Sequence, residues 1–214
     1  MKGVLLRWFI IVCGLFVFAF GCHLSIKAGI GVAPWDCLGM GMSNHLPFNY
    51  GVCMMISSVI ILIIDILMKE RIGFGTIIDA FITGNFVQLF NDIDLLPEPA
   101  GMHISVIYIV IGMFIMALGQ FIYMKCAQGC GPRDYLLVAI GKRMRKVPIG
   151  LVQILLWGVV LLVGWLLGGP VGVGTLITTF GCGIAMQIVF SLLKFEPRDV
   201  EHLDVIQTIK LLRE

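Results

Sequence analysis

Six apolar stretches divide this chain of 214 residues, and each is long enough, or nearly so, to cross a lipid bilayer. A helix needs about 20 apolar residues, at a rise of about 1.5 Å each, to cross the hydrocarbon core. Apolar residues make up 59% of the chain and charged residues only 13%, which is too little polar side chain to cover a soluble domain of this length. We therefore expect an all-α polytopic membrane protein with six transmembrane helices, at roughly residues 6–26, 49–68, 74–91, 103–124, 149–168 and 172–194.

The sequence also repeats itself internally. Residues recur 98 positions later as far as residue 38 (109 minus 11 for the first pair) and 99 positions later beyond it (150 minus 51). The matched pairs include Ile11/Ile109, Gly14/Gly112, Gly21/Gly119, Gly31/Gly129, Gly51/Gly150, Gly73/Gly172, Thr76/Thr175, Gly84/Gly183 and Gln88/Gln187. We predict a first repeat over residues 1–98, a second over 99–194, and an amphipathic cytoplasmic tail over 195–214. The glycines spaced by seven in the first helix of each repeat indicate close helix packing.

Each repeat contains one Gly-x-x-Pro-x-Asp turn, followed by a short segment at about 33–46 or 132–144. The turn residues are Gly31, Pro34 and Asp36 in the first repeat and Gly129, Pro132 and Asp134 in the second. Glycine and proline interrupt a helix, but proline is well tolerated in the first turn of the next one, where its missing N–H costs nothing. We therefore expect two short broken or re-entrant helices, each with an aspartate in its first turn.

The distribution of charge predicts how often the chain crosses the membrane. If the short segments do not cross and the amino terminus is cytoplasmic, the basic clusters at 69–71 and 142–146 fall inside and the acidic loop at 92–98 falls outside. Each repeat then crosses three times, and this odd number makes the two repeats antiparallel, as in many transporters. We therefore predict an inverted 3+3 repeat in the plasma membrane, with both termini in the cytoplasm.

Inverted symmetry would bring both aspartates to one site near the bilayer midplane. Arg133 stands where the first repeat has Trp35, so this site would be asymmetric. Spacings of three and four place Thr76, Asp79 and Thr83 on one helix face, where they could line the same cavity. The predicted solute-binding residues are Asp36, Asp134, Trp35, Arg133, Asp79, Gln88 and Gln187, held by structural turns at Gly31, Pro34, Gly129 and Pro132.

Simpler roles compete with this interpretation. An acid in the first turn of a helix also stabilises the positive end of the helix dipole. Glutamine within an apolar helix commonly serves helix-to-helix hydrogen bonding. Helix amino termini favour an anionic solute, whereas carboxylates favour a cation or a proton, so the sign of the solute charge stays open.

No enzyme, metal or cofactor motif is legible in the sequence. Cys126 and Cys130 lack the histidine or second cysteine pair of a zinc site. The Gly-x-Gly-Thr at 73–76 lacks the lysine of a phosphate-binding loop. No serine, histidine and acid are spaced as a catalytic triad. A net charge of +2 is too small to indicate nucleic-acid binding.

The paired motifs resemble those of a known group of bacterial membrane proteins. Gly-x-x-Pro-Trp-Asp at 31–36, Gly-Cys-Gly-Pro-Arg-Asp at 129–134, Leu-Leu-Gly-Gly at 166–169 and Gly-x-Gly-Thr at 172–175 resemble the YczE family of the wider YczE/YyaS/YitT group. The resemblance covers nearly the whole chain and implies a multi-pass protein of the bacterial cell membrane, without a defined activity. The stretch at 143–148 departs from the family, which favours Arg-Thr-Gly there.

Two functions remain as hypotheses. The first is a transporter or channel for a small molecule or ion, with the two turns at the site. The second is a non-transporting scaffold, regulator or accessory subunit of a larger membrane complex. In that case the basic loop and the tail at 195–214 would contact a membrane partner or a second copy of the chain.

Overall fold

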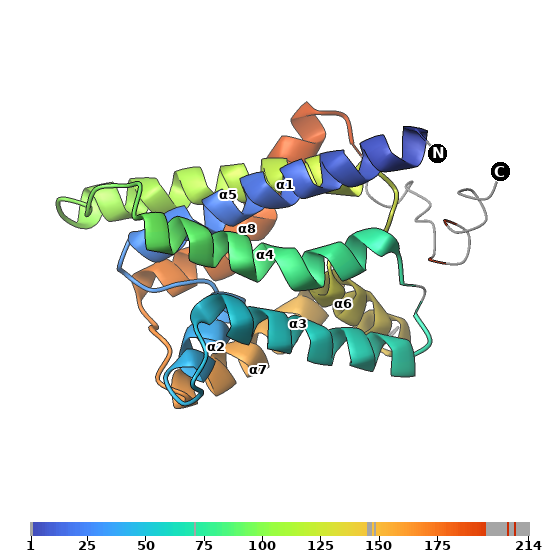
Figure 1. Ribbon diagram of the computed structural model, residues 1–214. Coiled ribbons are helices and arrows are strands. Elements are labelled where there is room, and N and C mark those ends of the chain that lie inside the picture. The colour runs from blue at the N-terminus through green and yellow to red at the C-terminus, as the bar shows by residue number, and fades with distance from the viewer. Residues whose placement is uncertain are drawn as a thin grey trace.

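The computed structural model describes residues 2–70, 72–144, 147, 149–195, 205 and 208. Every regular element within these residues is a helix, which confirms the predicted all-α class for the described chain (Figure 1). The helices are α1 (Lys2–Lys27), α2 (Pro34–Ser43), α3 (Tyr50–Leu67), α4 (Phe74–Ile93), α5 (Met102–Met124), α6 (Pro132–Arg143), α7 (Ile149–Leu166) and α8 (Val173–Leu192).

Four of these helices are long and apolar enough to cross a membrane. The qualifying segments are Leu5–Lys27, Tyr50–Leu67, Met102–Met124 and Val173–Leu192, which belong to α1, α3, α5 and α8. A shorter apolar segment, Val152–Leu166, lies in α7. α4 is 20 residues long, but polar residues such as Asp79 and Asn85 lower its mean hydropathy. The crossings expected at 74–91 and 149–168 therefore stay predictions.

The first helix of each predicted repeat packs against its counterpart through glycine. Gly14 of α1 lies against Gly119 of α5, and Gly21 lies against Gly112, so the two helices run antiparallel. A Cβ at Gly119 would lie 2.5 Å from the backbone nitrogen of Phe18. No side chain fits at that distance, so the two backbones touch, as small residues allow in membrane helices. The close packing predicted from these glycines is confirmed.

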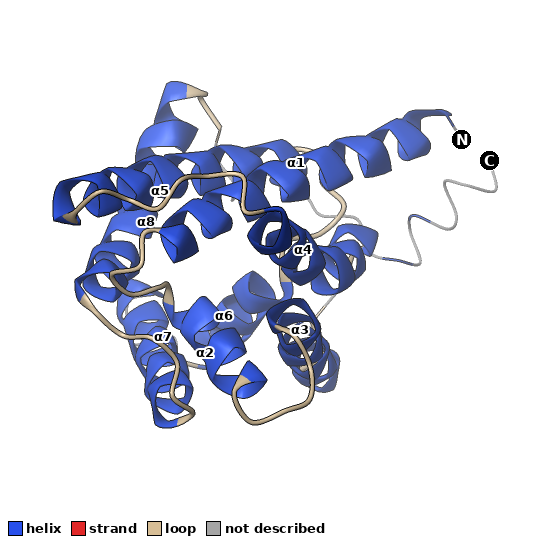
Figure 2. Cartoon of the chain, turned by 60° about the vertical axis from the view of Figure 1, so that its left-hand side comes forward, coloured by secondary structure: helices blue, strands red, loops and turns tan. Residues whose placement is uncertain are grey.

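The other helices pack around this pair in two layers (Figure 1 and Figure 2). α4 lies against α1, and α8 lies against α5, which completes the first layer. The second layer contains α2 against α7 and α3 against α6, and α3 also packs on α4. Each short helix, α2 or α6, therefore packs against a helix of the other predicted repeat.

Lys27, at the end of α1, holds the loop that joins α4 to α5. Its Nζ lies 2.5 Å from Asp94 Oδ1 and 2.5 Å from Glu98 Oε1. The hydrogen bond from the Lys27 ammonium holds the pKa of Asp94 below its usual range. This ion pair therefore stabilises the loop at neutral pH and is lost as the pH falls through the lowered pKa of Asp94. Both acids are exposed, so the contribution is small.

Replacing Gly119 with alanine should destabilise the fold through the contact between α1 and α5. The added Cβ would meet the backbone of Phe18 and Gly14, and forced overpacking of this kind costs about 1–3 kcal/mol. Thermal unfolding of the detergent-purified protein measures the change. Gly158→Ala on α7 is the matched control, because a Cβ there has no neighbour within 4 Å. Equal melting temperatures for the two variants would contradict the backbone contact.

Candidate functional site

The two predicted turns are held by glycines with positive φ. Gly31 has φ +107° and Gly129 has φ +109°, a region that favours glycine. A Cβ at Gly31 would lie 2.7 Å from Thr175 Oγ1, at the start of α8. A Cβ at Gly129 would collide with Thr76 Oγ1, at the start of α4. Each turn is therefore pressed against the first turn of a long helix, and no other residue fits there.

Backbone hydrogen bonds fix the same two turns. The Gly174 N–H of α8 donates to the Ile30 carbonyl at 2.7 Å, and the Gly75 N–H of α4 donates to the Gln128 carbonyl at 2.7 Å. These bonds satisfy polar groups in non-helical backbone, which must find protein partners when water is excluded. Each turn is therefore anchored to the last helix of the other predicted repeat.

Proline begins both short helices, α2 at Pro34 and α6 at Pro132. The residues before them, Ala33 and Gly131, offer no side-chain cap. The acid of each first turn therefore faces the positive end of its helix dipole without a competing cap. The expected short helices at 33–46 and 132–144 correspond to α2 and α6.

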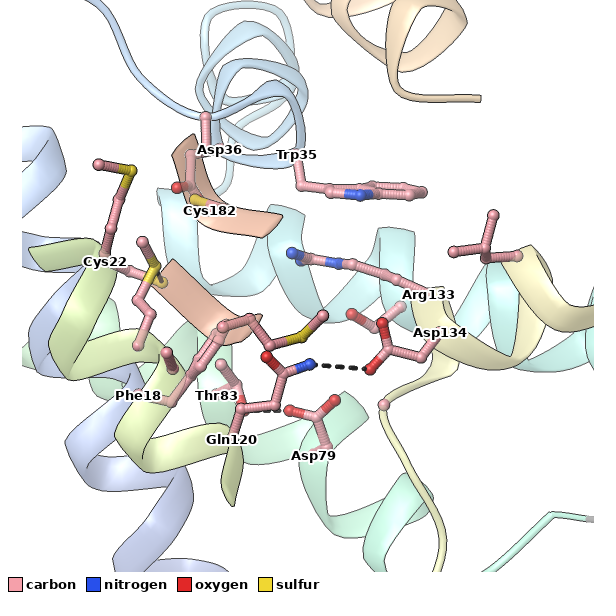
Figure 3. A pocket seen from close by; sticks show the side chains of 18 of the residues that line it. Phe18, Cys22, Trp35, Asp36, Asp79, Thr83, Gln120, Arg133, Asp134 and Cys182 are labelled. Atoms are coloured by element: carbon pink, nitrogen blue, oxygen red, sulfur yellow. Dashed lines mark hydrogen bonds between the residues drawn. The ribbon is translucent and has the colours of Figure 1, made fainter. Parts of the chain in front are cut away.

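The two turns open onto one internal cavity of about 150 Å³, which is lined by residues from all eight helices. Five of the predicted site residues line it: Trp35, Asp36, Asp79, Arg133 and Asp134. Figure 3 shows Arg133 between Trp35 on one side and Asp79 and Asp134 on the other. The two acidic turns and the acid of α4 therefore meet at one place.

Each of the three carboxylates accepts a hydrogen bond from a neutral donor. Asp36, which is only 3% exposed, accepts from the Tyr50 hydroxyl at 2.8 Å. Asp79 accepts from the Thr83 hydroxyl, one helical turn away. Asp134 lies 3.4 Å from Gln120 Nε2, a long hydrogen bond (Figure 3). Neutral donors stabilise an acid without cancelling its charge, so the cavity keeps its carboxylates available.

Gly131 separates the carboxylates of Asp79 and Asp134. A Cβ at this position would lie 2.8 Å from Asp79 Oδ2 and 3.7 Å from Asp134 Oδ2. The equivalent residue of the first repeat is Ala33, which also lines the cavity. The missing side chain at Gly131 therefore lets two acids approach the same stretch of backbone.

Arg133 supplies the positive charge of the cavity. Its guanidinium lies over the Trp35 ring at 4.9 Å from the ring centroid, and its Nη2 lies 3.8 Å from Met54 Sδ. Among the described residues, no carboxylate forms an ion pair with it. A guanidinium stacked on an aromatic face keeps its N–H groups free for another partner. One guanidinium therefore faces three carboxylates without being paired to any of them.

Both predicted glutamines lie away from the cavity. Gln88 accepts a hydrogen bond from the Gly51 N–H of α3 at 3.2 Å and donates to Asp92 at 2.6 Å. Gln187 is exposed on α8. Nine residues at about 100° each place Gln88 on the opposite side of α4 from Asp79. Thr76 is buried against Gly129, so only Asp79 and Thr83 of the predicted helix face line the cavity.

Several cavity residues lie outside the sequence prediction. Gln120 and Gln153 line the cavity from α5 and α7, and Tyr50 supports Asp36 from the start of α3. A polar residue within an apolar span was the available signal for both glutamines. Sulfur-bearing side chains also line the cavity, namely Cys22, Met113, Met116, Cys182 and Met186. Nothing in their sequence spacing distinguishes them from ordinary core residues.

Two residues of the predicted tail contact the segments that precede α4 and α6. The Val205 N–H donates to the Ile72 carbonyl at 3.0 Å, and the Thr208 hydroxyl donates to Gln128 Oε1 at 3.2 Å. Gln128 also anchors the Gly129 turn through its carbonyl. The rest of the amphipathic tail predicted at 195–214 lies outside the described residues, apart from Phe195.

Among the described residues, no group of three or more histidine, cysteine or acidic side chains is arranged to hold a metal ion. The cavity therefore offers separate carboxylates and one guanidinium rather than a ligand cage. Such an arrangement can bind a charged solute and exchange protons with it, because carboxylates take up and release protons.

Sequence comparisons find relatives in bacteria. An uncharacterized protein of Haemophilus influenzae is 29% identical over 184 residues, which is 86% of this chain and 83% of the relative. The uncharacterized membrane protein YczE of Bacillus subtilis is 28% identical over 87% of this chain and 86% of its own length. The uncharacterized protein YyaS of the same organism is 29% identical over 82% of this chain and 88% of its own length.

These relatives confirm the resemblance to the YczE and YyaS proteins that the paired motifs indicate. No solved structure matches the chain. A family model matches residues 5–191. This range includes both Gly-x-x-Pro-x-Asp turns and all the described helices except the first three residues of α1 and the last residue of α8. The chain therefore belongs to the family of unknown function DUF6198.

Proposed function

We propose that this protein is an integral membrane transporter or channel-like protein for a small solute that carries a positive charge. One observation carries the proposal: three carboxylates and one unpaired guanidinium line a single internal cavity at the two Gly-x-x-Pro-x-Asp turns. Ionisable residues are expensive inside membrane-spanning bundles and usually mark the path of a solute or proton. The cavity would be the binding site near the middle of the bilayer.

The balance of charge supports a cationic solute. Asp36, Asp79 and Asp134 outnumber Arg133, the one basic side chain among the described residues that line the cavity. The lining also contains apolar side chains such as Phe18 and Met113, which lower the local dielectric constant. Uncompensated negative charge is costly in such surroundings. A bound cation or bound protons would compensate this negative charge. A site that binds either of them in turn can exchange a cation for protons.

The proposed architecture is an inverted repeat with six crossings, in which α4 and α7 complete the four qualifying spans. Two reciprocal contacts support it. Gly14 and Gly21 of α1 pair in reverse order with Gly119 and Gly112 of α5. The loop carbonyls of Ile30 and Gln128 are bound by equivalent N–H groups of α8 and α4. Reciprocal contacts between equivalent residues are expected when two repeats are related by a two-fold axis in the membrane plane.

The second hypothesis, a non-transporting scaffold or accessory subunit, needs a partner at the basic loop or the tail. The described tail contacts, from Val205 and Thr208, are made with the protein itself. The proposal also has three parts that experiments can test separately. They are location in the plasma membrane, cytoplasmic placement of both termini, and binding of a partner or second copy at 195–214.

The topology can be tested with reporter fusions in a bacterial host. A fluorescent-protein fusion after Lys69 or after Met144 should fluoresce, because both loops would be cytoplasmic and green fluorescent protein matures there. An alkaline phosphatase fusion after Leu96 should be active, because the acidic loop would face outward. Activity of the phosphatase after Lys69 or Met144 would contradict the six-crossing inverted repeat.

Transport can be tested in liposomes with permanently charged probes. We expect uptake of radiolabelled benzyltrimethylammonium and little uptake of benzenesulfonate, an anion of similar size. Asp36→Asn and Asp134→Asn should each lower cation uptake by about tenfold or more, because removing one buried charge partner costs about 2–5 kcal/mol. Asp92→Asn is the matched control, since this acid lies outside the cavity lining.

Absence of uptake of every cationic probe by the parent protein, or equal uptake by the parent and both cavity variants, would contradict transport through this site. Each variant should first be shown to elute as a single species of the parent's size. The Asp36→Asn side chain can still accept the Tyr50 hydrogen bond, so the fold should survive.

Gly131→Ala tests whether the approach of Asp79 to Asp134 matters for transport. The new Cβ would lie 2.8 Å from Asp79 Oδ2 and force the carboxylate to move. We expect cation uptake to fall by about tenfold, since misplacement by about 1 Å can cost more than that. Ala33→Gly makes the reverse change at the equivalent position without crowding an acid, and should retain uptake. Equal uptake by the Gly131→Ala and Ala33→Gly variants would contradict a role in transport for the space beside Gly131.

A further inference from the structure

Two helix pairs that correspond in the repeats pack differently in the structure. In the first repeat, α3 and α4 lie in close contact: a Cβ at Gly51 would lie 3.0 Å from the Gly84 carbonyl oxygen. A Cβ at Gly84 would lie 2.8 Å from the Gly51 carbonyl oxygen. The Gly51 N–H also donates to Gln88 Oε1, which adds a hydrogen bond to this contact. The two backbones therefore touch at these glycines, as those of α1 and α5 do.

Two corresponding residues of the second repeat lack this contact. Gly183, which matches Gly84, has no neighbour within 4 Å of a Cβ, and Gln187, which matches Gln88, is exposed. Over the described residues, α7 and α8 do not form a packed pair, although α3 and α4 do (Figure 2). The glycine that brings the first pair together therefore faces open space in the second.

The cavity extends to this open side. Gln153 and Trp157 of α7 and Cys182 and Met186 of α8 all line it. Because these two helices are separated, the wall that they contribute is not sealed by contact between them. α8 is a candidate membrane span with exposed apolar residues such as Ile184 and Ile188, so in a bilayer this side would border the hydrocarbon region.

The lining of the cavity also differs between the repeats at equivalent positions. The polar wall consists of Asp79, Thr83, Gln120, Arg133 and Asp134. Thr83 of the first repeat corresponds to Cys182 of the second. Gln120 of the second repeat corresponds to Cys22 of the first. The sulfur wall consists of Cys22, Met113, Met116, Cys182 and Met186, and the Cys22 thiol donates to Met116 Sδ at 3.4 Å. The cavity is therefore amphipathic.

We infer that the gap between α7 and α8 is a lateral portal through which a hydrophobic organic cation reaches the cavity from the bilayer. This inference rests on the proposed function and specifies its solute. The apolar body of the cation lies against the sulfur wall near the portal, where flexible thioethers adapt to its shape. The charged group faces Asp79 and Asp134 of the polar wall and Asp36, which also lines the cavity.

The apolar path sets the chemical class of the solute. A small hydrophilic cation would have to lose its hydration in the hydrocarbon region before it met a carboxylate, which is costly. A cation with an apolar body partitions into the membrane interface and brings its own apolar surface. Arg133 repels a second positive charge, which favours a single cationic group.

The portal can be tested by filling the space beside Gly183. Gly183→Leu and Gly183→Phe add side chains where no atom lies within 4 Å of a Cβ, so both variants should fold. We expect them to slow uptake of benzyltrimethylammonium into proteoliposomes by about tenfold or more, in order of side-chain size. Gly158→Leu on α7, also without neighbours within 4 Å, is the matched control and should retain the parent rate.

The solute class can be tested by binding to the full-length protein in lipid nanodiscs, followed by fluorescence of the cavity tryptophans Trp35 and Trp157. Benzyltrimethylammonium should bind about tenfold or more tightly than tetramethylammonium, because burial of an aromatic group contributes at least that factor. Its neutral isostere, neopentylbenzene, should bind more weakly than the cation. Asp134→Asn should abolish the preference for the cation over the isostere.

The outcomes separate this inference from the proposed function. If Asp36→Asn and Asp134→Asn stop uptake while Gly183→Phe transports at the parent rate, the portal is overturned and transport through the cavity stands. If tetramethylammonium binds as tightly as benzyltrimethylammonium, the hydrophobic class is overturned. If the aspartate variants take up the cation at the parent rate, the proposed function itself fails. Slower uptake by both Gly183 variants, with binding of the hydrophobic cation, supports the portal.

Discussion

The arrangement of the cavity depends on two loops of non-helical backbone that are held by the protein itself. Ile30 and Gln128 each give a carbonyl to a backbone N–H at the start of a long helix, and Gly31 and Gly129 lie directly against the same helices. In apolar surroundings an unpaired peptide group costs several kcal/mol, so these turns need such partners to exist. Because each turn is fixed three and four residues before its proline, the start of α2 and of α6 is held close to these contacts. The positions of the acidic side chains follow from backbone contacts rather than from side-chain packing.

The same backbone contacts explain how acids are tolerated inside the bundle. Asp36 and Asp134 lie in the first turns of α2 and α6, where the helix dipole favours negative charge. Asp79 lacks that advantage because it lies within α4, and it is supported by the Thr83 hydroxyl instead. Arg133 adds a positive charge but is held by Trp35 rather than by an acid. The site therefore combines charged groups that are stabilised separately rather than by ion pairs with one another, over the described residues.

Sequence patterns predicted the parts of this structure that depend on backbone geometry. The glycine pairs of α1 and α5, the proline starts of α2 and α6 and the aspartates that follow them all require a particular residue at a particular place. The positions of Gln88 and Gln187 outside the cavity could have been anticipated from helical geometry. Gln88 lies nine residues after Asp79, and Gln187 lies nine residues after its counterpart Thr178, so each is about half a turn out of phase. The sulfur wall was not predictable, because cysteine and methionine are common in any apolar core. Whether α4 crosses the membrane depends on neighbours that cover its polar groups, such as Asp79, which hydropathy alone does not describe.

The difference between the two helix pairs lies beyond sequence patterns for another reason. Gly51 and Gly84 match Gly150 and Gly183, so the glycines alone would predict equal packing of α3 on α4 and of α7 on α8. The structure packs only the first pair. The residues beside the glycines differ: Asn85 follows Gly84, whereas Ile184 follows Gly183, and Ile184 is exposed on the outer surface of α8. The small residues are therefore not sufficient for close packing of two helices, and the residues that surround them must differ in what they pack against.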